Sequence, residues 1–227
     1  MARRPHADSR TGDQYISNKN NKKYAQLLRR NLLKGTGVAV FSVMGSNTAL
    51  AAASDNGSDQ PDPEAFYDFE GTGSTVIDRT GNNHTGEIVR ADRVPGRNGT
   101  VLAFDRTNGE YSKLGDADTL NPRTGSYSVS LWFRTASKEG ANHDGRDDSR
   151  ILFSKRGASN ERFVIKLVDE TPGSNVQVED ALTMQIKDDT GLGNDSATVN
   201  QSLADNEWHH VLAIRDTDNS KIRLYLD

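Results

Sequence analysis

The chain has 227 residues, of which 33% are hydrophobic, and a formal net charge of −4 at pH 7. That length accommodates one ordinary domain plus a leader. The absence of cysteine excludes disulfides, thiolate metal sites and cysteine nucleophiles. The low apolar fraction, together with 20 glycines, favours short strands joined by polar turns over helical bundles.

The net charge combines two parts of opposite sign. Residues 1–53 carry nine basic and two acidic residues, whereas residues 54–227 carry 19 basic and 30 acidic ones. An acidic body repels nucleic-acid phosphates, so we expect no nucleic-acid partner. Surface carboxylates also keep a protein soluble where salt screens their repulsion, and the composition therefore suggests a halophilic protein.

Residues 1–53 are predicted to be an export signal. Residues 29–34 (RRNLLK) resemble the twin-arginine motif, and the weakly apolar stretch 35–53 that follows contains the A-x-A cleavage pattern Ala49-Leu50-Ala51. The twin-arginine route carries folded cargo, so we expect a secreted or cell-surface protein that folds before export. A retained anchor is the alternative, but glycines and polar residues weaken insertion. We therefore expect no membrane span in the mature chain.

After a predicted solvated linker at residues 54–64, rich in Asp, Ser, Gly and Pro, hydrophobic residues alternate with period two and show no helical period. Such a pattern, with frequent turn residues, predicts an all-β antiparallel sandwich over residues 65–227. The predicted strands are, in chain order, 65–69, 86–89, 101–105, 111–113, 126–135, 151–155, 162–168, 182–187, 208–214 and 222–226, with a turn at 216–220.

Five segments resemble, in order and spacing, the laminin-G-like, concanavalin A-like lectin/glucanase domains. This resemblance covers residues 65–227 and implies a jelly-roll sandwich. Domains of that family continue past the last motif with further strands, so it also implies that C-terminal strands are missing here. The segments are 66–70 (FYDFE), 78–86 (DRTGNNHTG), 96–105 (GRNGTVLAFD), 127–134 (YSVSLWFR), and 207–211 (EWHHV) followed by 224–227 (LYLD).

Glucanases of this fold place paired carboxylates on alternate positions of one strand, as general acid and nucleophile. No such run occurs in this chain; Asp68 and Glu70 come nearest but lack a third partner in register. We therefore expect no enzymatic activity. A glycoside hydrolase or polysaccharide lyase of the concanavalin-like fold is the alternative.

Calcium is the candidate cofactor, with Asp78 and Asn82 as candidate ligands. Their oxygens lie at turn spacing beside a glycine, and Ca²⁺ prefers hard oxygen ligands. Many domains that this one resembles hold Ca²⁺ near this segment, partly through backbone carbonyls. The alternative is an Asx turn capped by its own side chains.

Candidate ligand-binding residues are Asp144 and Asp147, in the acidic loop 141–148, and the aromatic residues Tyr111 and Tyr225. The loop could hold an ion or ligand, but a solvated acidic loop is the alternative reading. A sugar site needs exposed aromatic rings with amides and acids. The chain is thus predicted to be a recognition module for a glycan or an extracellular protein. A purely structural or adhesive module of a larger surface protein is a further alternative.

Four further side chains carry expectations that the structure can check. Core packing is the expected role of Trp132 and Trp208, the only tryptophans. Successive strand residues face opposite sides, so His209 and His210 cannot jointly bind one metal. One of these histidines is expected in the core and the other at the surface.

Overall fold

The structure is a computed structural model that describes residues 38–43, 63–105, 108–115, 118–120, 125–136, 150–156, 162–170, 174–187 and 194–227. Within these residues every regular element is a strand, except for the 3₁₀ turn η3 (Asp118–Leu120), and every strand pair is antiparallel. None of the described residues belongs to a helix with the length and hydropathy of a membrane span. The predicted all-β fold class is confirmed.

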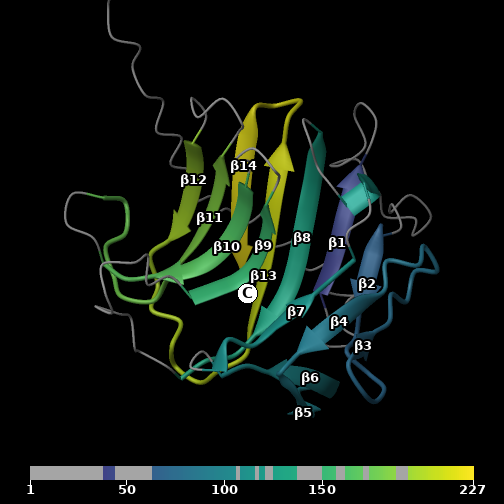
Figure 1. Cartoon of the computed structure of the whole chain (residues 1–227). Coiled ribbons are helices and arrows are strands. Elements are labelled where there is room, and N and C mark those ends of the chain that lie inside the picture. The colour runs from purple at the N-terminus through teal and green to yellow at the C-terminus, as the bar shows by residue number, and fades with distance from the viewer. Residues whose placement is uncertain are drawn as a thin grey trace, which may run out of the picture.

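One of the two large layers in Figure 1 is a five-stranded sheet. Its N-terminal strand lies inside the sheet, between two strands that come from other parts of the chain. In spatial order the strands are β14 (Lys221–Leu226), β13 (His209–Asp216), β8 (Ser126–Phe133), β1 (Val38–Val43) and β2 (Ala65–Tyr67).

The other large layer is a four-stranded meander, in which each strand pairs with its neighbour in sequence. A register shift between Ile165 and Lys166 interrupts one of its ladders. Its last strand was not predicted, because Asn194, Asp195 and Ser196 lack apolar alternation. The strands are, in spatial order, β12 (Asn194–Val199), β11 (Ala181–Lys187), β10 (Arg162–Val168) and β9 (Arg150–Arg156).

Two small sheets adjoin the end of the sandwich that holds β2 (Figure 1). One is a hairpin closed by Gly99, whose φ of 107° lies in the left-handed region that suits glycine. The three-stranded sheet comprises β3 (Thr75–Val76), β4 (Gly86–Val89) and β7 (Tyr111–Lys113), and the hairpin comprises β5 (Asp92–Gly96) and β6 (Gly99–Ala103).

The main core lies between the two large sheets. Strand β8 contributes alternate residues to it, as the sequence predicted, and Tyr127 packs edge-on against Phe163 of β10 at a ring-centroid distance of 4.7 Å. The buried members of this core are Tyr127, Val129, Leu131, Phe133, Phe163, Ile165, Leu167, Leu182, Met184, Ala197, Val199, Leu203, Val211, Ala213 and Leu224. A second, smaller cluster contains Ala65, Tyr67, Val76 and Ile88.

The first predicted strand of the domain is shorter than expected. Strand β2 ends at Tyr67, whereas the alternation had predicted a strand to residue 69. Phe69 has a φ of 58°, in the left-handed region that strands exclude. The alternation of Ala65, Tyr67 and Phe69 carries no sign of this local turn.

The hairpin between β13 and β14 turns at residues 217–220, within the predicted turn. Asp216 caps it and is only 3% exposed. Its carboxylate accepts hydrogen bonds from the Asn219 backbone N–H at 3.1 Å and from Arg223 Nη1 at 2.6 Å. Burial raises the pKa of Asp216, but the hydrogen bonds from Asn219 and Arg223 outweigh it and hold that pKa below its ordinary value of 3.8.

Acid is therefore expected to weaken this hairpin. Because the folded-state pKa lies below the unfolded one, Asp216 contributes its full stability above the unfolded pKa and loses it as the pH falls through the folded value. The wild type should lose more unfolding free energy than Asp216→Asn between about pH 6 and about pH 3, as measured by urea denaturation. Equal losses in the two proteins would contradict this role.

Candidate functional site

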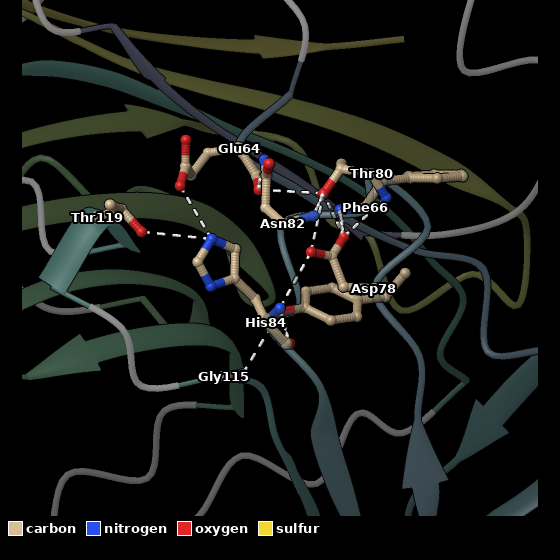
Figure 2. A network of polar contacts seen from close by, with 9 residues as sticks. Glu64, Phe66, Asp78, Thr80, Asn82, His84, Gly115 and Thr119 are labelled. Carbon is tan, nitrogen blue, oxygen red and sulfur yellow. Dashed lines mark hydrogen bonds and ion pairs between the residues drawn. The ribbon is translucent and has the colours of Figure 1, made fainter.

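The carboxylate of Asp78, which follows β3, is the centre of a dense hydrogen-bond network (Figure 2). It is 7% exposed. Oδ1 accepts the backbone N–H groups of Phe66 and Thr80, each at 3.0 Å, and Oδ2 accepts the backbone N–H of His84 at 3.2 Å. The Thr80 hydroxyl lies 2.8 Å from both oxygens. The chain returns to Asp78 because Gly81 and Asn83 adopt positive φ angles of 90° and 63°.

This network also sets the charge state of Asp78. Burial raises the pKa of its carboxyl, but the hydrogen bonds from Phe66, Thr80 and His84 outweigh burial and hold that pKa below its ordinary value. Asp78 is therefore an ionised acceptor at neutral pH, and its donors come from the start of β2 and from both sides of the turn.

A second set of contacts surrounds the buried side chain of His84 (Figure 2). Its Nε2 lies 2.9 Å from Glu64 Oε1 and 3.3 Å from Thr119 Oγ1. The Tyr67 hydroxyl donates to the His84 carbonyl at 2.6 Å and accepts the backbone N–H of Gly115 at 3.4 Å. Burial raises the pKa of Tyr67 to about 12, so this hydroxyl keeps its proton. These contacts connect segments that are far apart in the sequence.

The predicted calcium ligands Asp78 and Asn82 lie in this network, but their orientation suits hydrogen bonding. N–H and O–H donors face both oxygens of Asp78, where a cation would need free lone pairs. The Asn82 side-chain amide donates to the Glu64 carbonyl at 2.9 Å. Among the described residues no group of three or more His, Asp or Glu could hold a metal ion. As they lie, the two residues fit the Asx-turn alternative; calcium at this segment stays a prediction.

Of the four predicted ligand-binding residues, the structure describes Tyr111 and Tyr225, which lie in different sheets. Tyr111 is 51% exposed on the edge strand β7 of the three-stranded sheet. Tyr225 is half-buried on β14, at the edge of the five-stranded sheet. Asp144 and Asp147 lie outside the residues that the structure describes.

The outward face of the five-stranded sheet brings polar and aromatic residues together. Trp132 lies opposite His210, and in the next row Ser130 lies opposite Leu212, which lies opposite Tyr225. Since strand residues alternate between faces, these side chains lie on the side turned away from the main core. The Trp132 and His210 rings are 5.0 Å apart, and Ser130 Oγ lies 2.8 Å from His210 Nε2.

An exposed arginine lies over each tryptophan. The guanidinium carbon of Arg97 is 4.2 Å from the Trp132 ring centroid, and that of Arg134 is 5.2 Å from the Trp208 ring centroid. Such cation–π contacts leave guanidinium N–H groups able to bind further acceptors. We call this set the outer aromatic patch; its members are Arg97, Trp132, Arg134, Trp208 and Tyr225, and the buried His210 packs beside Trp132.

The roles expected of the tryptophans and histidines need correction. Trp132 and Trp208 are half-buried, and the core face of β8 belongs to other residues. His209 and His210 are both buried, although one was expected at the surface. His209 lies 3.0 Å from Asp205 Oδ1, which compensates for its burial. By the alternation of β8, Trp132 falls on the face opposite Val129, Leu131 and Phe133, which the predicted packing role did not take into account.

Comparison with known protein families was informative for the C-terminal half. Residues 106–227, more than half of the chain, match the Laminin_G_3 family, described as the concanavalin A-like lectin/glucanases superfamily. The chain belongs to this superfamily. The match contains every residue of the outer aromatic patch except Arg97. Comparisons with curated proteins and with solved structures gave no match.

Because the superfamily includes glucanases, we examined Asp68 and Glu70, the carboxylate pair that comes nearest to the paired carboxylates of a glucanase. Asp68 Oδ2 pairs with Arg79 Nε at 2.9 Å, while Glu70 Oε1 accepts the Thr100 backbone N–H at 2.8 Å. Each carboxylate is thus held by its own structural partners. Both residues precede the matched segment, and the part of the sequence resemblance before residue 106 stays a prediction.

Proposed function

We propose that this chain is an extracellular recognition module that binds carbohydrate through the outer aromatic patch. The observation that carries the proposal is that both tryptophans and Tyr225 lie on one sheet face, with the exposed guanidiniums of Arg134, from the same face, and of Arg97, from the β5–β6 turn, over the tryptophan rings. Aromatic rings stack on the C–H faces of sugar rings, and polar groups beside them fix the hydroxyls. Membership of a lectin/glucanase superfamily is compatible with this activity.

The arginines further suggest which glycans bind. Arg97 and Arg134 each present a guanidinium at the surface above a tryptophan. A guanidinium donates paired hydrogen bonds to carboxylate or sulfate oxygens. We therefore expect acidic glycans to bind more tightly than neutral ones, although the chain as a whole is acidic.

The predicted export signal supports a location outside the cell. Residues 29–34 carry the arginine pair of the predicted export signal, and residues 49–51 carry the cleavage pattern. Export by the twin-arginine route would deliver a folded binding module to the cell exterior, where glycans of cell surfaces and matrices are accessible. An extracellular protein ligand and a purely adhesive role remain alternatives to be separated by experiment.

Affinity gel electrophoresis tests the binding step. The full chain is run through gels containing a polyuronate, a sulfated polysaccharide or a neutral glucan. We expect at least one acidic polysaccharide to retard the wild type, and Trp132→Ala to bind it about tenfold or more weakly because the ring that holds the Arg97 guanidinium in place is lost. Phe104→Ala is the matched control, since Phe104 is 54% exposed and lies outside the patch; it should behave as the wild type does.

Two results would contradict the proposal. One is wild-type mobility that no polysaccharide alters, with the protein shown to be folded by circular dichroism. The other is equal retardation of the wild type and Trp132→Ala. Reducing ends and unsaturated products are measured in the same mixtures, and their release would favour the enzymatic alternative.

A further inference from the structure

The hairpin of β5 and β6, at the bottom of Figure 1, carries Arg97 to the outer aromatic patch. Gly96 pairs with Gly99, so Arg97 and Asn98 form the two-residue tip. The exposed Arg97 lies over the Trp132 ring of β8. Among the described strands, β5 and β6 pair only with each other, and a two-stranded hairpin alone is marginally stable in water. The position of Arg97 therefore depends on what anchors the hairpin.

One anchor is a carboxylate that binds the second strand of the hairpin. Glu70 lies in the turn after β2. Its Oε1 accepts the backbone N–H of Thr100, and its Oε2 accepts the Thr100 hydroxyl, each at 2.8 Å. The absence of a side chain at Gly99 makes room for this contact, because a Cβ there would lie 2.3 Å from Glu70 Oε1. Both oxygens of Glu70 thus bind the hairpin close to its tip.

The other anchor runs from the first strand of the hairpin back to the same turn. Arg93 donates from Nε to the Phe69 carbonyl at 2.7 Å and from Nη2 to the Thr75 carbonyl at 2.6 Å, and its Nη1 donates to the Gly73 carbonyl. Phe69 and Gly73 have positive φ angles of 58° and 72°, in a turn where three carbonyls converge on one guanidinium. Turn and hairpin are therefore held together by one charged side chain from each.

We propose that Glu70 and Arg93 are positioning residues that hold Arg97 above Trp132, and that Arg97, so held, selects acidic glycans at the outer aromatic patch. This inference rests on the proposed carbohydrate binding and deepens it. A fixed guanidinium binds a carboxylate or sulfate group more tightly than a mobile one, because it loses less conformational freedom on binding. Neutral glycans lack such a group, so their affinity should depend much less on the two anchors.

The sign of the effect separates positioning from charge. Glu70→Ala removes a negative charge, which by itself should strengthen the binding of an acidic polysaccharide. We expect binding about fivefold or more weaker instead, because the hairpin loses an anchor. Glu87→Ala is the matched control, since Glu87 is exposed on β4 in the neighbouring small sheet and its side chain forms none of the anchoring bonds. In affinity gels of the full chain it should bind as tightly as the wild type or slightly more tightly.

Two further variants separate positioning from a general loss of structure. Glu70→Gln keeps an oxygen that can accept the Thr100 N–H, so it should retain most of the affinity. Arg97→Ala should abolish the preference for acidic over neutral polysaccharides, and adding Glu70→Ala to it should weaken binding little further, because both changes act through the same guanidinium. Additive losses in the double variant, or equal losses for acidic and neutral polysaccharides, would contradict the proposal.

A second measurement needs no glycan. In a Trp208→Phe background the tryptophan emission comes from Trp132 alone. Acrylamide should quench this emission more strongly in Arg97→Ala, because the guanidinium no longer covers the ring. Glu70→Ala and Arg93→Met, each of which removes one anchor, should increase quenching in the same way. Quenching that stays at the level of the Trp208→Phe parent in the folded anchor variants would overturn the positioning role.

The two experiments distinguish failure of this inference from failure of the proposed function. If Trp132→Ala weakens polysaccharide binding while Glu70→Ala binds as tightly as Glu87→Ala, carbohydrate binding stands and the positioning role is rejected. If no polysaccharide retards the folded wild type, the proposed function and the selection of acidic glycans both fail, whereas acrylamide quenching still decides whether the anchors position Arg97.

Discussion

Asp180→Ala is expected to lower the free energy of unfolding by about 3–5 kcal/mol, which is typical when one partner of a buried ion pair is removed. Asp180, immediately before β11, is 1% exposed. Its carboxylate pairs with the Arg150 guanidinium at the start of β9, and Ser202 Oγ lies 3.3 Å from its other oxygen. Alanine would leave the mostly buried Arg150 without its buried counter-charge. It would also place a Cβ-only residue at a φ of 60° that aspartate tolerates better.

Guanidinium chloride denaturation of the full chain measures this loss. Asp169→Ala is the matched control, because Asp169 contacts the same Arg150 nitrogen at 3.2 Å but is about one-third exposed. Solvent screening should limit its effect to about 1 kcal/mol. Asp180→Asn keeps the left-handed backbone and removes only the charge, so its loss should be intermediate. Equal effects of the two alanine variants would show that burial of the pair does not decide its contribution.

Asp78→Ala is expected to lower the free energy of unfolding by about 3 kcal/mol, because it leaves several buried N–H groups without an acceptor. The donors come from Phe66, Thr80 and His84, so the loss affects both the start of β2 and the turn before β4. Asp68→Ala is the control, since Asp68 is more exposed and pairs with Arg79 near the surface. A smaller loss for Asp78 than for Asp68 would contradict the account.

The same variant separates the two roles considered for Asp78. Thermal unfolding is measured with calcium and with a chelator, since an ion that binds only the folded state raises the unfolding temperature. If Asp78 acts only as a hydrogen-bond acceptor, Asp78→Ala should lower the midpoint of thermal unfolding equally with calcium and with chelator. If Asp78 is a calcium ligand, calcium should raise the unfolding temperature of the wild type but not that of Asp78→Ala.

Alternation of apolar residues was sufficient to predict most of the strands that line the main core, but not β12. The prediction for residues 162–168 coincides with β10, and β8 begins at Ser126 as expected. Both strands are half or fully buried on one face, and that condition produces a period of two. Strand β12 was missed because its first half, Asn194 to Ser196, is polar, and only Ala197 and Val199 reach the main core.

Two features depend on contacts between distant parts of the chain and could not be predicted from the sequence. Residues 38–43 looked like part of an export signal, and their pairing with β2 and β8 depends on the folded sheet. The hydrogen bonds of Asp78 involve donors up to twelve residues away, so local spacing alone left the calcium and Asx-turn interpretations equal.

The outer aromatic patch, too, could be predicted only in part from the sequence. The sequence placed Trp132 opposite the core-facing residues of its own strand, but family motifs suggested a packing role. The neighbours of Trp132 come from elsewhere: Arg97 lies between β5 and β6, and His210 is on β13. Their convergence depends on strand order and register, which alternation does not specify.

Tryptophan fluorescence during a polysaccharide titration tests binding at the outer aromatic patch most directly. The chain has only two tryptophans, Trp132 and Trp208, and both belong to the patch, so the intrinsic tryptophan emission reports on this face. The account predicts a saturable change in emission over the concentration range that retards the protein in affinity gels, and a much smaller change in Trp132→Phe. Retardation of the folded wild type without any change in tryptophan emission would contradict it.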